Sequence, residues 1–146
     1  MARAEPLTET APGAETALRV GIDLIEIDRV RRALDRHGDG FRERCFTPAE
    51  REYCESKPNP AQHYAGRFAA KEAILKLLGT GWRGKIAWTD IEVTNNSAGR
   101  PEVTLSGEVK AIADRMGIKH ISISITHTAN FAIASAVALT ASHEDE

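Results

Sequence analysis

The stretch GRFAAKEAILKLLGTG, residues 66–81, predicts a helix that is apolar or alanine on almost every side. We expect this helix to run from about residue 61 to residue 78 and to end at the glycines that follow it. A helix that is apolar all round is typical of a buried position. Charged residues nevertheless lie within it, namely Arg67 near its beginning and then Lys71, Glu72 and Lys76 in its middle.

Two of these charges lie on a narrow strip between the apolar stripes of the helix. Glu72 and Lys76 share this strip with Ala65 and Ala69. The i, i+4 spacing is that of an ordinary ion pair on a solvated edge, which contributes only about 0.3–0.5 kcal/mol. Alternatively, the small alanines leave room for a ligand beside a carboxylate and an ammonium group. Both interpretations predict a narrow polar strip.

The elements predicted around this helix indicate an α+β fold. In chain order they are a strand (18–27), a helix (28–38) with Asp28 as a possible N-cap, a helix that begins at the capping box of Thr47, Pro48 and Glu50, the long helix, a hairpin (86–106), a helix (106–117) and two strands (120–127 and 131–139). This order does not repeat the β-α-β pattern of a doubly wound parallel sheet.

Length and composition indicate one domain of 146 residues. We expect a folded unit over residues 18–140, a disordered N-terminal tail over 1–17 and an acidic C-terminal tail over 141–146. No run approaches the ~18 apolar residues that span a bilayer, and no secretory signal is present, so we expect a cytoplasmic protein without a membrane partner. A net charge of −2, 5% aromatic residues and the lack of a nucleic-acid-binding motif argue against a nucleic-acid partner.

Asp23 lies between Ile22 and Leu24 inside the first predicted strand. Aspartate is depleted in strands, and a buried unpaired carboxylate is costly, so this residue needs a cation or a set of donors. Alternatively, Asp23 lies at the end of the strand and caps the next turn. If Asp23 and Glu72 converge, they form a hard-oxygen site suited to Mg²⁺. Nearby lysines would then face phosphate, an arrangement typical of phosphoryl transfer.

His127 is the last residue of the next-to-last predicted strand and has three possible roles. It could belong to a nucleophilic triad, it could be a strand-end histidine in the core, or it could donate a hydrogen bond to a ligand phosphate. The sequence contains neither a nucleophile elbow nor an obvious orienting acid, which disfavours Ser/His hydrolase chemistry.

The helix after Asp23 carries a basic stripe. Arg29, Arg32 and Arg36 recur at i, i+3 and i+7, opposite the apolar face. Such charge runs are usually solvated faces. Concentrated arginine on a chain of net negative charge nevertheless suits docking of an acidic partner.

Three separated segments together resemble holo-acyl carrier protein synthase, the small class of 4′-phosphopantetheinyl transferases. They are GIDLIEIDRV (21–30), GRFAAKEAILKLLGTG (66–81) and SITHTANFAIA (124–134). The long helix carries the signature Phe-x-x-Lys-Glu-Ala-x-x-Lys from Phe68 to Lys76, and the first segment carries Gly-x-Asp at Gly21 and Asp23. The resemblance covers residues 18–139 and implies an antiparallel sheet packed with a long helix.

The resemblance implies transfer of the phosphopantetheine arm of coenzyme A to a serine of apo-acyl carrier protein, with release of adenosine 3′,5′-bisphosphate. Asp23 and Glu72 would hold Mg²⁺ against the pyrophosphate. Glu72 would take the proton of the attacking serine, directly or through a bound water. Lys76 would stabilise charge on the leaving phosphate. Such transfer supports fatty acid or related lipid and polyketide biosynthesis.

The resemblance also implies binding residues and an assembly. The residues that would contact coenzyme A are Arg67, Lys71, Lys76, His127 and Thr128. Arg29 and Arg44 would dock the acidic carrier protein. Small members of this family are typically homotrimers with active sites between subunits, so a homotrimer is expected.

Two positions bear on this resemblance. Arg19 stands where many relatives have a glycine, and Ile25 stands where the larger monomeric transferases place another carboxylate, which favours the small trimeric class. A rival from another class is a non-catalytic oligomeric module that binds coenzyme A or a carrier protein without transfer. Such a module would tolerate loss of Glu72, whereas a transferase would not.

Overall fold

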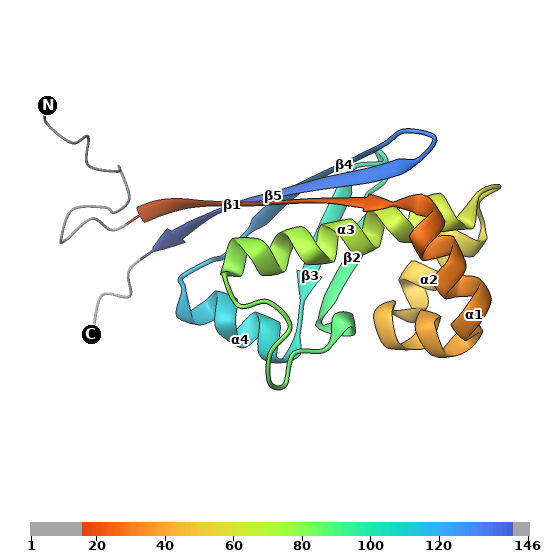
Figure 1. Ribbon diagram of the computed structural model, residues 1–146. Helices are drawn as coiled ribbons and strands as arrows, with labels where there is room; N and C mark the ends of the chain where they lie inside the picture. Colours follow the sequence, from red (N-terminus) through yellow and green to blue (C-terminus); the bar gives the residue numbers. More distant parts are fainter. Residues whose placement is uncertain (1–15, 142–146) are drawn as a thin grey trace, which may run out of the picture.

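The structure is a computed structural model that describes residues 16–141. Its elements, in chain order, are β1 (Thr16–Glu26), α1 (Ile27–Cys45), α2 (Pro48–Glu55), α3 (Pro60–Leu78), a short 3-10 helix η1 (Trp88–Asp90), β2 (Ile91–Asn95), β3 (Pro101–Leu105), α4 (Gly107–Arg115), β4 (Ile121–His127) and β5 (Phe131–Ala141) (Figure 1). The expected tails, 1–17 and 141–146, lie outside the described residues except at Thr16, Ala17 and Ala141, which belong to strands.

The strands form two antiparallel sheets. The larger sheet has the order β1-β5-β4, and the hairpin of β2 and β3 forms the smaller sheet. In Figure 1, β1 and β5 run along α3, with α1 and α2 at one end of this helix and α4 near the other. The α+β fold expected from the sequence is confirmed. None of the helices in residues 16–141 is long and apolar enough to cross a membrane.

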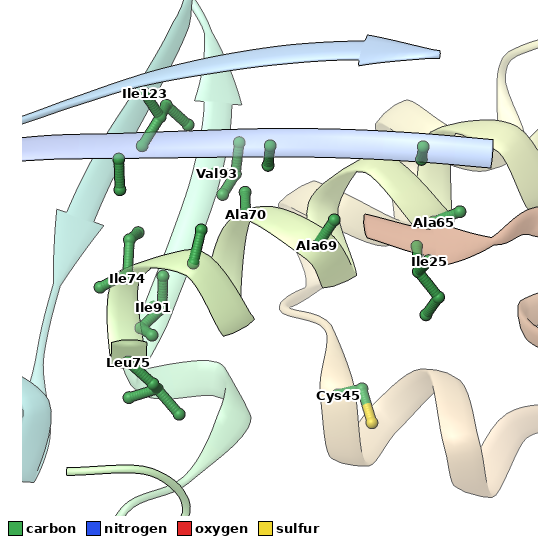
Figure 2. Close-up of a cluster of buried hydrophobic side chains, with 14 of the residues drawn as sticks. Ile25, Cys45, Ala65, Ala69, Ala70, Ile74, Leu75, Ile91, Val93 and Ile123 are labelled. Carbon is green, nitrogen blue, oxygen red and sulfur yellow. The ribbon is translucent and has the colours of Figure 1, made fainter. Parts of the chain in front are cut away.

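Small residues let α3 approach the larger sheet closely. Alternate residues of β5 that face α3 are fully or almost fully buried alanines, from Ala132 to Ala138. Helix α3 meets them with its own alanines, and Figure 2 shows Ala65, Ala69 and Ala70 in this buried cluster. The contact is closest at Gly21 of β1, where an added Cβ would lie 1.8 Å from the carbonyl oxygen of Ala73. Only glycine therefore fits at this point of the strand.

The other face of the larger sheet exposes large apolar side chains. Gly21 and Ile25 are buried on one face of β1 with Asp23 partly buried between them, whereas Val20, Ile22 and Leu24 are exposed on the opposite face. The exposed apolar residues, which we call the outer apolar face, are Leu18, Val20, Ile22, Leu24, Phe131, Val137 and Leu139, each 37–63% exposed. The two strands pair Val20 with Val137 and Leu18 with Leu139, so the face is continuous. A contiguous apolar patch of this kind marks an interaction surface.

The helix boundaries confirm one capping prediction and correct another. Thr47 and Glu50 form the predicted capping box, with Thr47 N donating to Glu50 Oε1 at 2.9 Å and Glu50 N donating to Thr47 Oγ1 at 3.3 Å. Asp28 is not an N-cap, since α1 begins after Glu26. This helix also continues beyond Gly38, which introduces a kink with φ 49° and ψ −127°. It resumes because Phe41 and Cys45 are buried in the core.

Candidate functional site

An open cavity of about 440 Å³ lies where β1, α1 and α3 meet. Asp23 and Glu72 both line this cavity, so the structure brings together the two carboxylates singled out in the sequence. Arg29 and Arg44 of α1 line it as well. The cavity therefore places two acids beside two guanidinium groups that come from a different helix.

Lys76 pairs with Asp23 and not with Glu72, which lies one turn earlier in the same helix. Its Nζ donates to Asp23 Oδ1 at 2.9 Å and to the Ile22 carbonyl oxygen at 3.0 Å. The Asp23 side chain is 16% exposed, and that of Lys76 is 56% exposed. This contact supplies the cation that a carboxylate inside a strand requires. The alternative of a Glu72–Lys76 pair on a solvated edge is not what the structure contains.

Glu72 instead contacts a residue that the sequence analysis missed. Trp82 Nε1 donates to Glu72 Oε1 at 3.1 Å, and Trp82 lies in the loop between α3 and η1. The Trp82 ring packs on Trp88, with ring centroids 3.5 Å apart. The available signal was a tryptophan between two glycines directly after the helix that carries Glu72.

The two carboxylates fit a magnesium ion by their chemistry. Hydrogen bonds from donors within residues 16–141 reach one oxygen of Asp23 and one oxygen of Glu72, which leaves the second oxygen of each to coordinate a cation. In the same part of the chain, no group of three or more His, Cys, Asp or Glu residues could hold a metal. Magnesium is typically bound through one or two carboxylates, with waters and substrate phosphates as its other ligands. The donor set therefore suits Mg²⁺.

Lys71, expected to contact coenzyme A, is placed differently by the structure. Its side chain is fully buried, and Nζ donates to Glu50 Oε1 at 2.7 Å, to the Cys45 carbonyl oxygen at 2.8 Å and to the Trp88 carbonyl oxygen at 3.1 Å. Burial lowers the pKa of Lys71, and the charge of Glu50 opposes this effect. An ammonium group holds three hydrogens, so these three acceptors use all its donors. Lys71 thus joins α3 to the segments around it and reaches no ligand from the surface.

Arg67 and His127 belong to a second, basic cluster outside the cavity of Asp23 and Glu72. The Arg67 guanidinium lies 3.9 Å from the centroid of the Tyr53 ring and donates to Asn95 Oδ1 at 2.7 Å. His127 Nε2 is hydrogen-bonded to the Gln62 side chain at 2.6 Å.

His63 lies among these cations. Its pKa is lowered by burial and then by the positive charges of Arg67, Lys57 and His127. Such a convergence of basic groups favours an anion.

Thr128, the remaining residue expected at coenzyme A, lies in the turn between β4 and β5. Its Oγ1 accepts hydrogen bonds from the backbone N–H groups of Asn130 at 3.3 Å and Phe131 at 3.1 Å. A hydroxyl that accepts in this way still has its hydrogen to donate. The side chain therefore shapes the turn next to His127 and keeps one donor.

The chain is similar to known proteins over most of its length. The family profile described as the 4′-phosphopantetheinyl transferase superfamily matches residues 19–136. The chain is 46% identical to a holo-[acyl-carrier-protein] synthase from Solibacter usitatus over 117 residues, which covers 80% of this chain and 94% of that protein. It is 48% identical to one from Caldanaerobacter subterraneus over 120 residues, with 82% and 93% covered.

Solved structures show the same fold. The crystal structure of holo-[acyl-carrier-protein] synthase from Neisseria meningitidis matches with a TM-score of 0.75 at 30% identity, covering 82% of this chain and 96% of that one. The Helicobacter pylori synthase in complex with coenzyme A matches with a TM-score of 0.72 at 35% identity, with 82% and 98% covered. The chain therefore belongs to the 4′-phosphopantetheinyl transferase superfamily, as an enzyme of its holo-[acyl-carrier-protein] synthase group.

Proposed function

We propose that this enzyme transfers the 4′-phosphopantetheine group of coenzyme A to a serine of an apo-acyl carrier protein in a Mg²⁺-dependent reaction. The products are holo-acyl carrier protein and adenosine 3′,5′-bisphosphate. The observation that carries the proposal is the shared cavity of Asp23 and Glu72, with the Lys76 ammonium 2.9 Å from Asp23. The coenzyme A complex of the Helicobacter pylori relative supports the choice of donor.

In this proposal, Asp23 and Glu72 would hold the ion, which would neutralise pyrophosphate charge when bound. Glu72 would accept the proton of the serine hydroxyl, directly or through a bound water, as the serine oxygen forms a bond to the phosphorus of the phosphopantetheine. The bond from this phosphorus to the bridging oxygen breaks, and its electron pair leaves with adenosine 3′,5′-bisphosphate. Lys76 would stabilise that developing negative charge, because its exposed side chain places the ammonium 2.9 Å from Asp23.

We also propose that the basic surface of α1 docks the carrier protein. Arg29 and Arg44 line the cavity of the two carboxylates, and a neighbouring hollow is lined by Arg32 and Arg36. An acidic carrier protein seated there would bring its serine to the cavity. Carrier proteins of this kind serve fatty acid or related lipid and polyketide synthesis, and we expect the reaction to take place in the cytoplasm.

The assembly we propose is a homotrimer. Two features support it: the outer apolar face of β1 and β5, which needs a partner, and the basic cluster of Arg67 and His127, which lies outside the cavity of the carboxylates. A complete site would pair the carboxylates of one subunit with the basic cluster and Thr128 of its neighbour. The basic cluster and Thr128 would bind coenzyme A. We expect Ile22→Glu to sediment as a monomer and to lose transfer activity. A fully active monomeric wild-type enzyme would contradict the shared site.

The decisive experiment is intact-mass spectrometry of an apo-acyl carrier protein after incubation with this enzyme, coenzyme A and Mg²⁺. We expect a mass gain of one phosphopantetheine group, which Glu72→Gln abolishes. The matched control is Glu52→Gln, which removes an exposed carboxylate on α2 and leaves the reaction intact.

The same experiment tests the rival interpretation. A module that only binds would retain coenzyme A in calorimetry and give no mass gain with any carrier protein. It would also tolerate Glu72→Gln without loss of coenzyme A binding. If both results were obtained, the function of this cavity would be binding and not transfer.

A further inference from the structure

We propose that Trp82 is a positioning residue of the metal site, which holds the Glu72 carboxylate in place through its indole N–H. The inference rests on the proposed function, because it assigns Glu72 to the metal. Trp82 itself would touch neither metal nor substrate. It would fix one oxygen of Glu72 so that the other is presented to the cation.

The first support is the contact between the two side chains. Trp82 Nε1 lies 3.1 Å from Glu72 Oε1, and an indole N–H can only donate. Glu72 is half-buried in the wall of the cavity, and its terminal torsion is broad in the absence of such a partner. A bond to a single oxygen therefore removes rotational freedom and leaves Oε2 as the coordinating atom.

The second support is that Trp82 is itself held in place, although it lies in a loop. Its ring packs on Trp88 at 3.5 Å between centroids, and Trp88 stacks on Phe68 of α3 at 4.5 Å. The Trp88 backbone is fixed in turn, because its carbonyl oxygen accepts from the buried Lys71 ammonium at 3.1 Å. Trp82 is therefore connected to the core on one side and to Glu72 on the other.

Together, these contacts give Lys71 and Glu72, which are adjacent in α3, complementary roles. Lys71 anchors the segment that carries Trp88, Trp88 supports Trp82, and Trp82 orients Glu72. Packing alone would need only an aromatic ring at position 82. The N–H directed at the carboxylate adds an outer-shell hydrogen bond of the kind that orients metal ligands, whose loss typically weakens metal binding about 10–100-fold.

The test compares Trp82→Phe with Trp88→Phe in the full-length enzyme. Trp82→Phe keeps an aromatic ring and removes the N–H that faces Glu72. Trp88→Phe makes the same chemical change one ring further from the carboxylate. Binding is measured with Mn²⁺ in place of Mg²⁺, by the electron paramagnetic resonance signal of free Mn²⁺ in the presence of coenzyme A. Transfer kinetics and the thermal unfolding midpoint are measured alongside.

We expect Trp82→Phe to bind Mn²⁺ about 10-fold or more weakly and to raise the KM for Mg²⁺ in proportion. Its KM for carrier protein and its unfolding midpoint should match those of Trp88→Phe. Unchanged Mn²⁺ affinity in Trp82→Phe would overturn the positioning role while wild-type transfer stands. A wild-type enzyme that neither binds Mn²⁺ nor transfers would overturn the proposed function, and this inference with it.

Discussion

Removing the charge of Glu50 should destabilise the fold strongly, because Lys71 would then be buried without a counter-charge. Both side chains are fully buried, and Lys71 Nζ lies 2.7 Å from Glu50 Oε1. Breaking such a pair from one side typically costs about 3–5 kcal/mol. A domain of this kind has a free energy of unfolding of about 5–15 kcal/mol, so Glu50→Gln should lose a large fraction of its stability. The oxygen of glutamine can still accept from Thr47 N, but its amide nitrogen cannot accept from Val93 N as Glu50 Oε2 does at 3.1 Å, so the loss combines the missing charge with one hydrogen bond.

The assay is urea unfolding at neutral pH of wild type, Glu50→Gln, Lys71→Met and the double variant. Replacing both members of a buried pair by uncharged groups is often close to neutral, so we expect the double variant to be more stable than Glu50→Gln alone. A Glu50→Gln midpoint equal to that of wild type would refute this reasoning. Equal losses that simply add in the double variant would refute it as well, since the two residues would then not interact.

The same variants test the placement of Lys71. Folded Lys71→Met should bind coenzyme A with the affinity of wild type in titration calorimetry, because every donor of this lysine is used inside the protein. Much weaker binding by the folded variant would return Lys71 to the ligand site that the sequence suggested.

Three further changes have defined outcomes. Gly21→Ala should lose transfer activity and stability, because its Cβ would lie 1.8 Å from the Ala73 oxygen and push β1, with Asp23, away from α3. Gly40→Ala is the control, since it has open space around it, and an active, stable Gly21→Ala would contradict the close contact. Burial raises the pKa of the Cys54 thiol to about 12. The folded state therefore keeps the thiol proton above about pH 9, where the unfolded chain loses it. Cys54 should therefore make stability fall with rising pH there, by up to about 1.4 kcal/mol per pH unit, and the fall measured by urea unfolding should be less steep in Cys54→Ala than in wild type. Charge reversal at Arg29 and Arg44 should raise the KM for carrier protein far more than that for coenzyme A in transfer kinetics, and equal effects on both would count against docking there.

Local sequence signals were enough to predict most elements. The capping box at Thr47 and the glycine after Leu78 act within one turn of chain, and Gly79 adopts the left-handed conformation (φ 76°) that ends α3. The hairpin of β2 and β3 likewise follows from its turn residues. The helix from Asp28 was misjudged because Gly38 is a stop signal by itself, whereas burial of Phe41 carries α1 past it.

The sequence by itself determined that charges lie within a buried helix and that Asp23 needs a partner, because these statements depend only on residue type and periodicity. Tertiary structure decided which charge has which task. Lys71 and Glu72 are neighbours in the chain, yet α3 turns about 100° between them. Lys71 therefore enters the core toward Glu50, while Glu72 faces the cavity and Trp82. Such pairings join elements distant in the chain, and no local pattern specifies which donor meets which carboxylate.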